Sequence, residues 1–307
     1  MAHDAAKPSP RFAFQIVELI DFSGTQSRTY LAHRTNGVHP VEIVAKKVHL
    51  DLYKDIAQAQ AEALDVRLRK ILTLEHPNLV RHLAYYGPRK INHVDVPHYM
   101  ILMEYCTGGN LHAAAAFHIA ASLIQTWTRQ IVDGLLYLHA QNIVHGEISS
   151  SHILLSSPDW NNCRMKIAHL DTTERPQRDW SAPKDTDECR YAFRSPEKIQ
   201  GGDTGRKSDI WSFGCVVLEM ASGSLRFVKE VKGHQHYLKS DLEVMYYIGS
   251  GGSPEIPQEL PDELRAFVAY CQKRDPVLRP LAAELLYTDF LTLANISQWS
   301  DPRPQRS

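Results

Sequence analysis

The sequence lacks several features that would assign it to a specialised class of protein. No apolar run approaches the roughly 18 residues that a transmembrane helix needs, and residues 1–8 have no apolar core of the kind found in signal peptides. The formal net charge is −1, so charge points neither to nucleic acid nor to a membrane surface. The five cysteines form no Cys-x-x-Cys pair, which favours reduced thiols in the cytoplasm. None of the 16 histidines lies at metal-ligand spacing from a cysteine, and we predict no metal site.

What remains is an ordinary globular composition. Hydrophobic residues make up 43% and charged residues 22% of the chain, and 307 residues suffice for one domain of two lobes. We expect residues 1–11 to be a disordered leader and residues 294–307 to be a linker or tail, because both segments are poor in large apolar side chains.

The first part of the chain indicates a small sheet with one helix. Loose alternation over 14–32 predicts two strands joined by a turn, and the β-branched residues of 41–50 predict a third. A helix is expected over 53–74, where apolar residues recur at helical spacing. Two further strands are expected over 79–86 and 99–104.

The second part of the chain indicates mostly helices. Apolar residues recur at spacings of three and four over 122–141, which predicts a helix with one buried face. A polar loop lies between two apolar runs over 143–155, and residues 165–168 form a short predicted strand. A largely apolar helix is expected over 207–220.

Three motifs here resemble signatures of protein kinases. Residues 209–214 read Asp-Ile-Trp-Ser-Phe-Gly, residues 195–197 read Ser-Pro-Glu where the family has Ala-Pro-Glu, and residues 274–280 read Arg-Asp-Pro-Val-Leu-Arg-Pro. With the loop at 143–155 they occur in the family's order and at its intervals. The chain therefore resembles a protein kinase from about residue 12 to residue 293.

The resemblance implies an α+β, bilobal, protein-kinase-like fold. The expected N-lobe, residues 12–105, is small and β-rich with one main helix, and the expected C-lobe, residues 106–293, is larger and mostly helical. The resemblance also implies four structural residues. These are His145 at the head of the loop, Asp209 beneath the loop backbone, and Glu197 and Arg279 as a buried ion pair.

At the catalytic positions the sequence departs from the family. Where active kinases have His-Arg-Asp-Leu-Lys-x-x-Asn, Glu147 stands at the catalytic Asp, Ser149 at the Lys and His152 at the metal-binding Asn. His169 stands at the Asp that holds magnesium, and Arg67 stands at the helix Glu that pairs with the strand lysine. Magnesium prefers oxygen ligands, so imidazoles suit it poorly.

A carboxylate does follow His169, but at a distance of two residues. Asp171 lies two positions late, and strand alternation does not by itself return it to the site.

The nucleotide-binding residues that the resemblance implies are Lys46 on the third strand, Gly24 in the phosphate loop and Glu104 near the hinge. Lys47 is a competing register for the strand lysine, because Val-Ala-x-Lys also fits at 44–47. Two of the three glycines of the phosphate loop are replaced, which would crowd the phosphates. We therefore expect ATP and magnesium binding to be weak or absent, with no cofactor.

These losses predict that the chain is not an enzyme but a pseudokinase, with no catalytic residues. Its expected role is allosteric or scaffolding regulation of a kinase domain in cis or in trans, with a homodimer as a further expectation and no binding to nucleic acid or membrane. A divergent active serine/threonine kinase that binds ATP through Lys46 is one alternative, and a pure interaction scaffold is another.

Two families share parts of the pattern. Residues 242–261 resemble the large lobe of mitogen-activated protein kinase kinase kinases. Residues 134–139 and 144–151 resemble the pseudokinase domain of the starvation-sensing kinase of initiation factor 2α, of the general control nonderepressible type. The second resemblance is favoured, and it implies a role in stress control of translation initiation.

Overall fold

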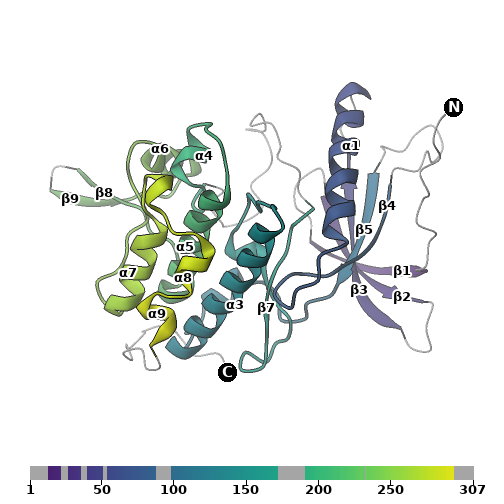
Figure 1. The fold of residues 1–307 in the computed structure, drawn as a ribbon, viewed down its shortest axis with the longest axis horizontal. Coiled ribbons are helices and arrows are strands. Elements are labelled where there is room, and N and C mark those ends of the chain that lie inside the picture. The colour runs from purple at the N-terminus through teal and green to yellow at the C-terminus, as the bar shows by residue number, and fades with distance from the viewer. Residues whose placement is uncertain are drawn as a thin grey trace. The chain divides into compact units, whose positions relative to one another are not determined.

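The computed structural model describes residues 13–21, 27–35, 40–50, 54–87, 98–171, 191–231 and 233–293. Within these ranges the chain forms two compact units. The first takes the described residues up to Glu75, then Arg81–Tyr105 and Asp171. The second takes His76–Val80, Cys106–Leu170 and the later described residues. Each unit is described by itself below, with elements labelled as in Figure 1.

The first unit is built on a five-stranded antiparallel sheet of order β1-β2-β3-β5-β4. Its elements in chain order are β1 (Phe14–Asp21), β2 (Ser27–Arg34), β3 (Val41–His49), α1 (Lys54–Ile71), β4 (His82–Tyr86) and β5 (His98–Glu104). Small and branched side chains from the three middle strands form a buried cluster in this sheet: Ala32, Ile43, Ala45 and Leu102.

Helix α1 packs through the apolar face that its sequence predicts. Leu64, Leu68 and Ile71 recur at helical spacing and are buried. Two tyrosine hydroxyls on the sheet donate hydrogen bonds to the same helix. Tyr99 on β5 reaches a backbone carbonyl of α1 at 3.0 Å, and Tyr85 on β4 reaches the carboxylate of Asp65 at 2.7 Å.

The second unit is mostly helical. Its helices are α2 (Leu111–Ala115), α3 (Ala121–Ala140), α4 (Pro196–Ile199), α5 (Arg206–Ser222), α6 (Asp241–Gly249), α7 (Asp262–Cys271), α8 (Ala282–Leu285) and α9 (Asp289–Thr292), with short 3-10 turns η1 (Ser150–His152) and η2 (Pro276–Leu278). Helix α5 is buried on all sides from Ser208 to Ala221, which explains its continuous apolar sequence. In Figure 1, α5 lies among the other helices of this unit.

Two short hairpins complete the second unit: β6 (Ile153–Leu155) with β7 (Met165–Ile167), and β8 (Val228–Val231) with β9 (His234–Tyr237). Helix α3 approaches β7 closely at Gly134, where an added Cβ would lie 2.9 Å from Ile167. A larger residue here would require the end of the Ile167 side chain, and the carbonyl oxygen of Asn78 at 3.0 Å, to shift.

The prediction of an α+β, bilobal kinase-like fold is confirmed by this architecture. The chain passes between the two units at several points, one of them between Tyr105 and Cys106. The described helices include none that is long and apolar enough to cross a membrane.

Candidate active site

The first unit contains a buried ion pair between Lys46 and Asp171. Lys46 lies in the middle of β3, opposite Ile101 on β5, and its Nζ is 2.8 Å from Asp171 Oδ2. Only 5% of the Lys46 side chain and 2% of the Asp171 side chain are exposed. Lys47, the competing residue, is only partly buried. The structure therefore selects Lys46 as the strand lysine.

The expectation that Asp171 would not return to the site is wrong, and the backbone explains why. Side chains alternate only while the chain is extended, and β7 ends at Ile167. His169 then adopts a left-handed conformation with φ of 64°, which is uncommon for residues other than glycine. This turn ends the alternation, and Asp171 is placed beside Lys46.

The second unit holds the catalytic loop on a buried carboxylate. Asp209, near the start of α5, accepts hydrogen bonds from the backbone nitrogens of His145 at 2.9 Å and Gly146 at 2.8 Å. Its Oδ2 also lies 2.9 Å from His139 Nε2 at the end of α3. Gly146 has φ of 79°, so glycine suits the position that the family gives to Arg.

Both ring nitrogens of His145 are used inside the loop. Nε2 lies 2.7 Å from the carbonyl oxygen of Ala168, and Nδ1 accepts from the backbone nitrogen of Glu147 at 3.1 Å. Burial lowers the pKa of His145 to about 4, against the opposing effects of Asp209 and of that carbonyl. His145 is therefore a neutral, structural histidine at physiological pH.

The tip of the loop carries Glu147, His152 and His169. The imidazole rings of His152 and His169 are stacked, with centroids 4.1 Å apart and planes 7° from parallel. His169 Nδ1 lies 3.8 Å from Glu147 Oε2, and one possible ligand atom from each of the three residues lies within 4.8 Å of the others. The side chain of Glu147 is 43% exposed, so solvent and solutes reach it.

The surroundings keep Glu147 ionised. Partial burial would raise its pKa, but the interactions with His169, with His152 and with Lys198 outweigh that effect and hold the pKa well below its usual range. Lys198 on α4 donates a hydrogen bond to the carbonyl of Gly146. Glu147 is thus a permanently charged, accessible carboxylate on a loop with a fixed backbone.

The expected partners Glu197 and Arg279 are in contact. Arg279 Nη2 lies 2.6 Å and Nη1 2.7 Å from the two carboxylate oxygens of Glu197, and the Arg279 side chain is fully buried. Three backbone carbonyls accept the remaining guanidinium hydrogen bonds: those of Lys207, Lys273 and Arg274. The pKa of Glu197 falls to about 2, because the hydrogen bonds from Arg279 and Ser208 outweigh burial.

The remaining site residues of the sequence analysis lie apart from these contacts. The Glu104 carboxylate accepts from the backbone nitrogen of Arg81 at 2.7 Å, which links β5 to the start of β4. Arg67 lies partly buried on α1, and Ser149 precedes the 3-10 turn η1. Gly24 lies outside the described residues.

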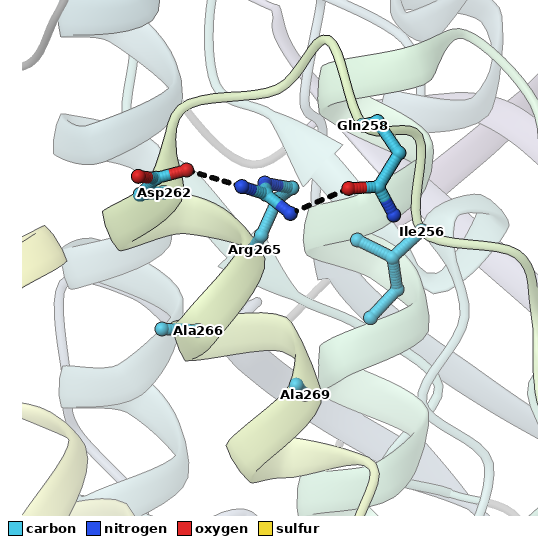
Figure 2. Close-up of a pocket in the computed structure, with 6 residues that line it drawn as sticks. All are labelled: Ile256, Gln258, Asp262, Arg265, Ala266 and Ala269. Atoms are coloured by element: carbon cyan, nitrogen blue, oxygen red, sulfur yellow. Dashed lines mark hydrogen bonds and ion pairs between the residues drawn. The ribbon is translucent and has the colours of Figure 1, made fainter.

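Figure 2 shows a separate pocket on the second unit, with a volume of about 370 Å³. Its lining residues are Ile256, Gln258, Asp262, Arg265, Ala266 and Ala269. Arg265 is held between the carboxylate of Asp262 and the amide oxygen of Gln258, so its charge is already matched within the pocket. None of the candidate catalytic residues lines this pocket, and we assign it no role in the reaction.

Comparison with known proteins agrees with the fold. The family described as protein kinase domain matches residues 22–291. Mitogen-activated protein kinase kinase kinase 1 of Arabidopsis thaliana is 32% identical over 76% of this chain and 36% of its own length. Mitogen-activated protein kinase kinase kinase 4 of Mus musculus is 31% identical over 69% of this chain and 12% of its own length. The chain therefore spans only a part of these relatives.

A third relative is covered more fully. Mitogen-activated protein kinase kinase kinase 17 of Arabidopsis thaliana is 28% identical over 88% of this chain and 67% of its own length. The fold, the buried lysine pair and the family match define a protein-kinase-like protein. The chain belongs to the protein kinase domain family. These relatives agree with the resemblance to mitogen-activated protein kinase kinase kinases that residues 242–261 suggest. They do not support the resemblance to the starvation-sensing kinase.

Two predictions from the sequence are wrong. The first, that the chain is not an enzyme, is overturned by its relation to proteins named as kinases and by the Lys46–Asp171 pair that is typical of catalytic kinases. The second, that it has no cofactor and binds ATP and magnesium weakly or not at all, fails for the same reasons. Both predictions relied on the positions of residues within the kinase motifs. By those positions Asp171 would lie away from Lys46, whereas in the structure the two side chains are in contact.

Proposed function

We propose that the protein is a serine/threonine protein kinase of the mitogen-activated protein kinase kinase kinase type that binds ATP through Lys46. The observation that supports this most strongly is the buried Lys46–Asp171 pair. Transferring two charges out of water costs several kcal/mol per ion, and a pair of apolar residues would often be as stable or more so. Keeping the pair is therefore better explained by chemistry than by stability.

The two residues fit the groups that kinases bind. The Lys46 ammonium is a compact cation suited to phosphate oxygens, and the Asp171 carboxylate is a hard oxygen ligand suited to Mg²⁺. ATP supplies the phosphoryl group that is transferred, and the divalent cation neutralises charge on its phosphates. Lys46 on β3 and Asp171 after β7 hold each other in place through their ion pair.

Glu147 takes the place of the general base in this proposal. Its carboxylate accepts the proton of a serine or threonine hydroxyl while the hydroxyl oxygen forms a bond to the γ-phosphorus of ATP. The bond between that phosphorus and the bridging oxygen breaks, and ADP leaves. The low pKa of Glu147 keeps it ionised, and the hydrogen bonds to Asp209 fix the backbone that carries it.

The relatives suggest the substrate. Their names describe kinases that act on mitogen-activated protein kinase kinases, and such a kinase is the proposed protein substrate here. Another kinase domain, in cis or in trans, is thus a proposed partner, and homodimer formation is a further proposal. A role in stress control of translation would require an initiation factor as substrate, and none of the contacts described here favours it.

The proposal is tested by measuring transfer of labelled phosphate from ATP to a mitogen-activated protein kinase kinase. Wild-type protein should transfer phosphate, and Glu147→Gln should lower the rate by about 100-fold or more, since a positioned base contributes 10²–10⁴. Glu259→Gln, at an exposed glutamate, is the matched control and should behave as wild type. Wild-type protein without activity, or equal rates for wild type and Glu147→Gln after repeated purification, would contradict the proposal.

A further inference from the structure

The sequence predicted no metal ligands, yet the fold gathers three. Glu147 precedes the turn η1, His152 is the last residue of that turn, and His169 follows β7. The cluster therefore cannot be read from spacing in the chain. One possible ligand atom from each residue lies within 4.8 Å of the other two. The two imidazole rings are stacked, so at least one ring must rotate before both nitrogens can point at one ion at the usual metal–nitrogen distance of about 2.0–2.1 Å.

The hydrogen bond of His152 prepares that ring for coordination. His152 Nδ1 lies 2.6 Å from the backbone carbonyl oxygen of Glu147. A carbonyl only accepts, so Nδ1 carries the proton and the lone pair remains on Nε2. Histidines that bind metals in proteins nearly always donate their other ring N–H in this way, which fixes the tautomer and the ring orientation. The supporting contact of a metal-binding histidine is thus present.

His145, the neighbouring histidine, has no ring nitrogen left to bind a metal ion. Both nitrogens of His145 are occupied by the backbone of Glu147 and Ala168, so His145 supports the loop and contributes no ligand. The cluster therefore offers two imidazoles and one carboxylate. Three protein ligands with one face open to solvent is the arrangement of catalytic rather than structural zinc sites.

The backbone of His169 is a further feature that favours a functional role for this cluster. His169 occupies the left-handed region, and such backbone conformations in residues other than glycine concentrate at functional sites.

We propose that Glu147, His152 and His169 form a binding site for a divalent transition-metal ion, with Zn²⁺ as the best match. Imidazole nitrogen favours Zn²⁺ and its neighbours in the series over Mg²⁺, which prefers six oxygen ligands. The site is distinct from the Lys46–Asp171 pair, whose carboxylate suits Mg²⁺. The inference does not rest on the proposed function, because binding of the ion requires no nucleotide. A Zn²⁺ ion bound to Glu147 would occupy the carboxylate that acts as the base in that function.

The test is binding of Zn²⁺ alone to the full chain, followed by calorimetry, with Co²⁺ absorption in the visible range as a report on nitrogen ligands. We expect one ion per chain. Loss of a supporting hydrogen bond costs 10–100-fold in affinity, so His152→Ala and His169→Ala, which each remove a ligand, should lose at least about 100-fold. His236→Ala, on the exposed strand β9, is the control and should bind as wild type.

A second variant protects the test against misfolding. His152→Asn with His169→Asp places oxygen ligands at the two positions, and it should lose Zn²⁺ while gaining affinity for Mg²⁺. Wild-type protein that binds no Zn²⁺, or unchanged Zn²⁺ affinity in both single variants, would overturn the proposal. Because no nucleotide is present, these results are independent of whether phosphate transfer is observed.

Discussion

The frame beneath the catalytic loop and the tip of that loop follow the kinase pattern to different degrees. The frame consists of Asp209, His139 and His145, all buried and joined by hydrogen bonds. The tip consists of Glu147, His152 and His169, which are exposed or partly exposed and stand where the family motifs have Asp, Asn and Asp. A buried hydrogen-bonded residue can be replaced only at a large cost in stability, whereas an accessible side chain is free to change the chemistry.

The largest effect on stability is predicted at another buried contact of the second unit, the Glu197–Arg279 pair. Arg279→Ala leaves the Glu197 carboxylate without its guanidinium partner, and breaking a buried pair in this way costs roughly 3–5 kcal/mol. The free energy of unfolding from urea titration measures it. Arg265→Ala is the matched control, because Asp262 is 86% exposed and such surface pairs contribute about 0–1 kcal/mol. Equal losses of stability in the two variants would contradict the claim that the buried ion pair contributes more than the exposed one.

The next effect is a pH dependence that arises from His145. Its folded pKa of about 4 lies below the ordinary 6.5, so the unfolded chain binds more protons between these values. The stability that His145 supplies is complete above pH 6.5 and is lost as the pH falls towards 4. The total loss in the free energy of unfolding is about 3 kcal/mol, with a slope of at most about 1.4 kcal/mol per pH unit.

His145→Gln removes this titration, and the difference in unfolding free energy between the variant and wild type should change over that window. Stability measured by urea titration at intervals from pH 7 to pH 4 checks the expectation. A constant difference across the window would mean that His145 is not buried in its neutral form.

The smallest effect on stability is expected at the tip. Glu147→Ala and His169→Ala remove partly exposed side chains, and substitutions away from buried networks usually change stability by about 0.5 kcal/mol or less. The same variants should nevertheless lose phosphate transfer. Melting temperature and transfer rate measured side by side sharpen the comparison, and a large loss of stability at the tip would show that it belongs to the frame.

The sequence predicted the frame and the fold well, for a physical reason. The largely apolar run over 207–220 indicated a buried helix, and the place of Asp209 beneath the loop followed from the resemblance to protein kinases. The resemblance to protein kinases also implied that Glu197 and Arg279 form a pair, and they are in contact.

The chemistry of the site could not be predicted in the same way. The position of Asp171 depends on the left-handed turn at His169, and a single unusual backbone angle leaves no signal in hydrophobic periodicity. The meeting of Glu147, His152 and His169 likewise depends on the path of the chain around β6 and β7.

The most direct test of the central claim is ATP binding measured as a shift in stability. Wild-type protein with ATP and Mg²⁺ at 100 times the dissociation constant should gain about 2.7 kcal/mol. Lys47→Met should gain the same, because its side chain lies outside the buried pair, whereas Lys46→Met should gain little relative to its own nucleotide-free state. An equal gain in Lys46→Met, or no gain in wild-type protein at millimolar ATP, would contradict the account.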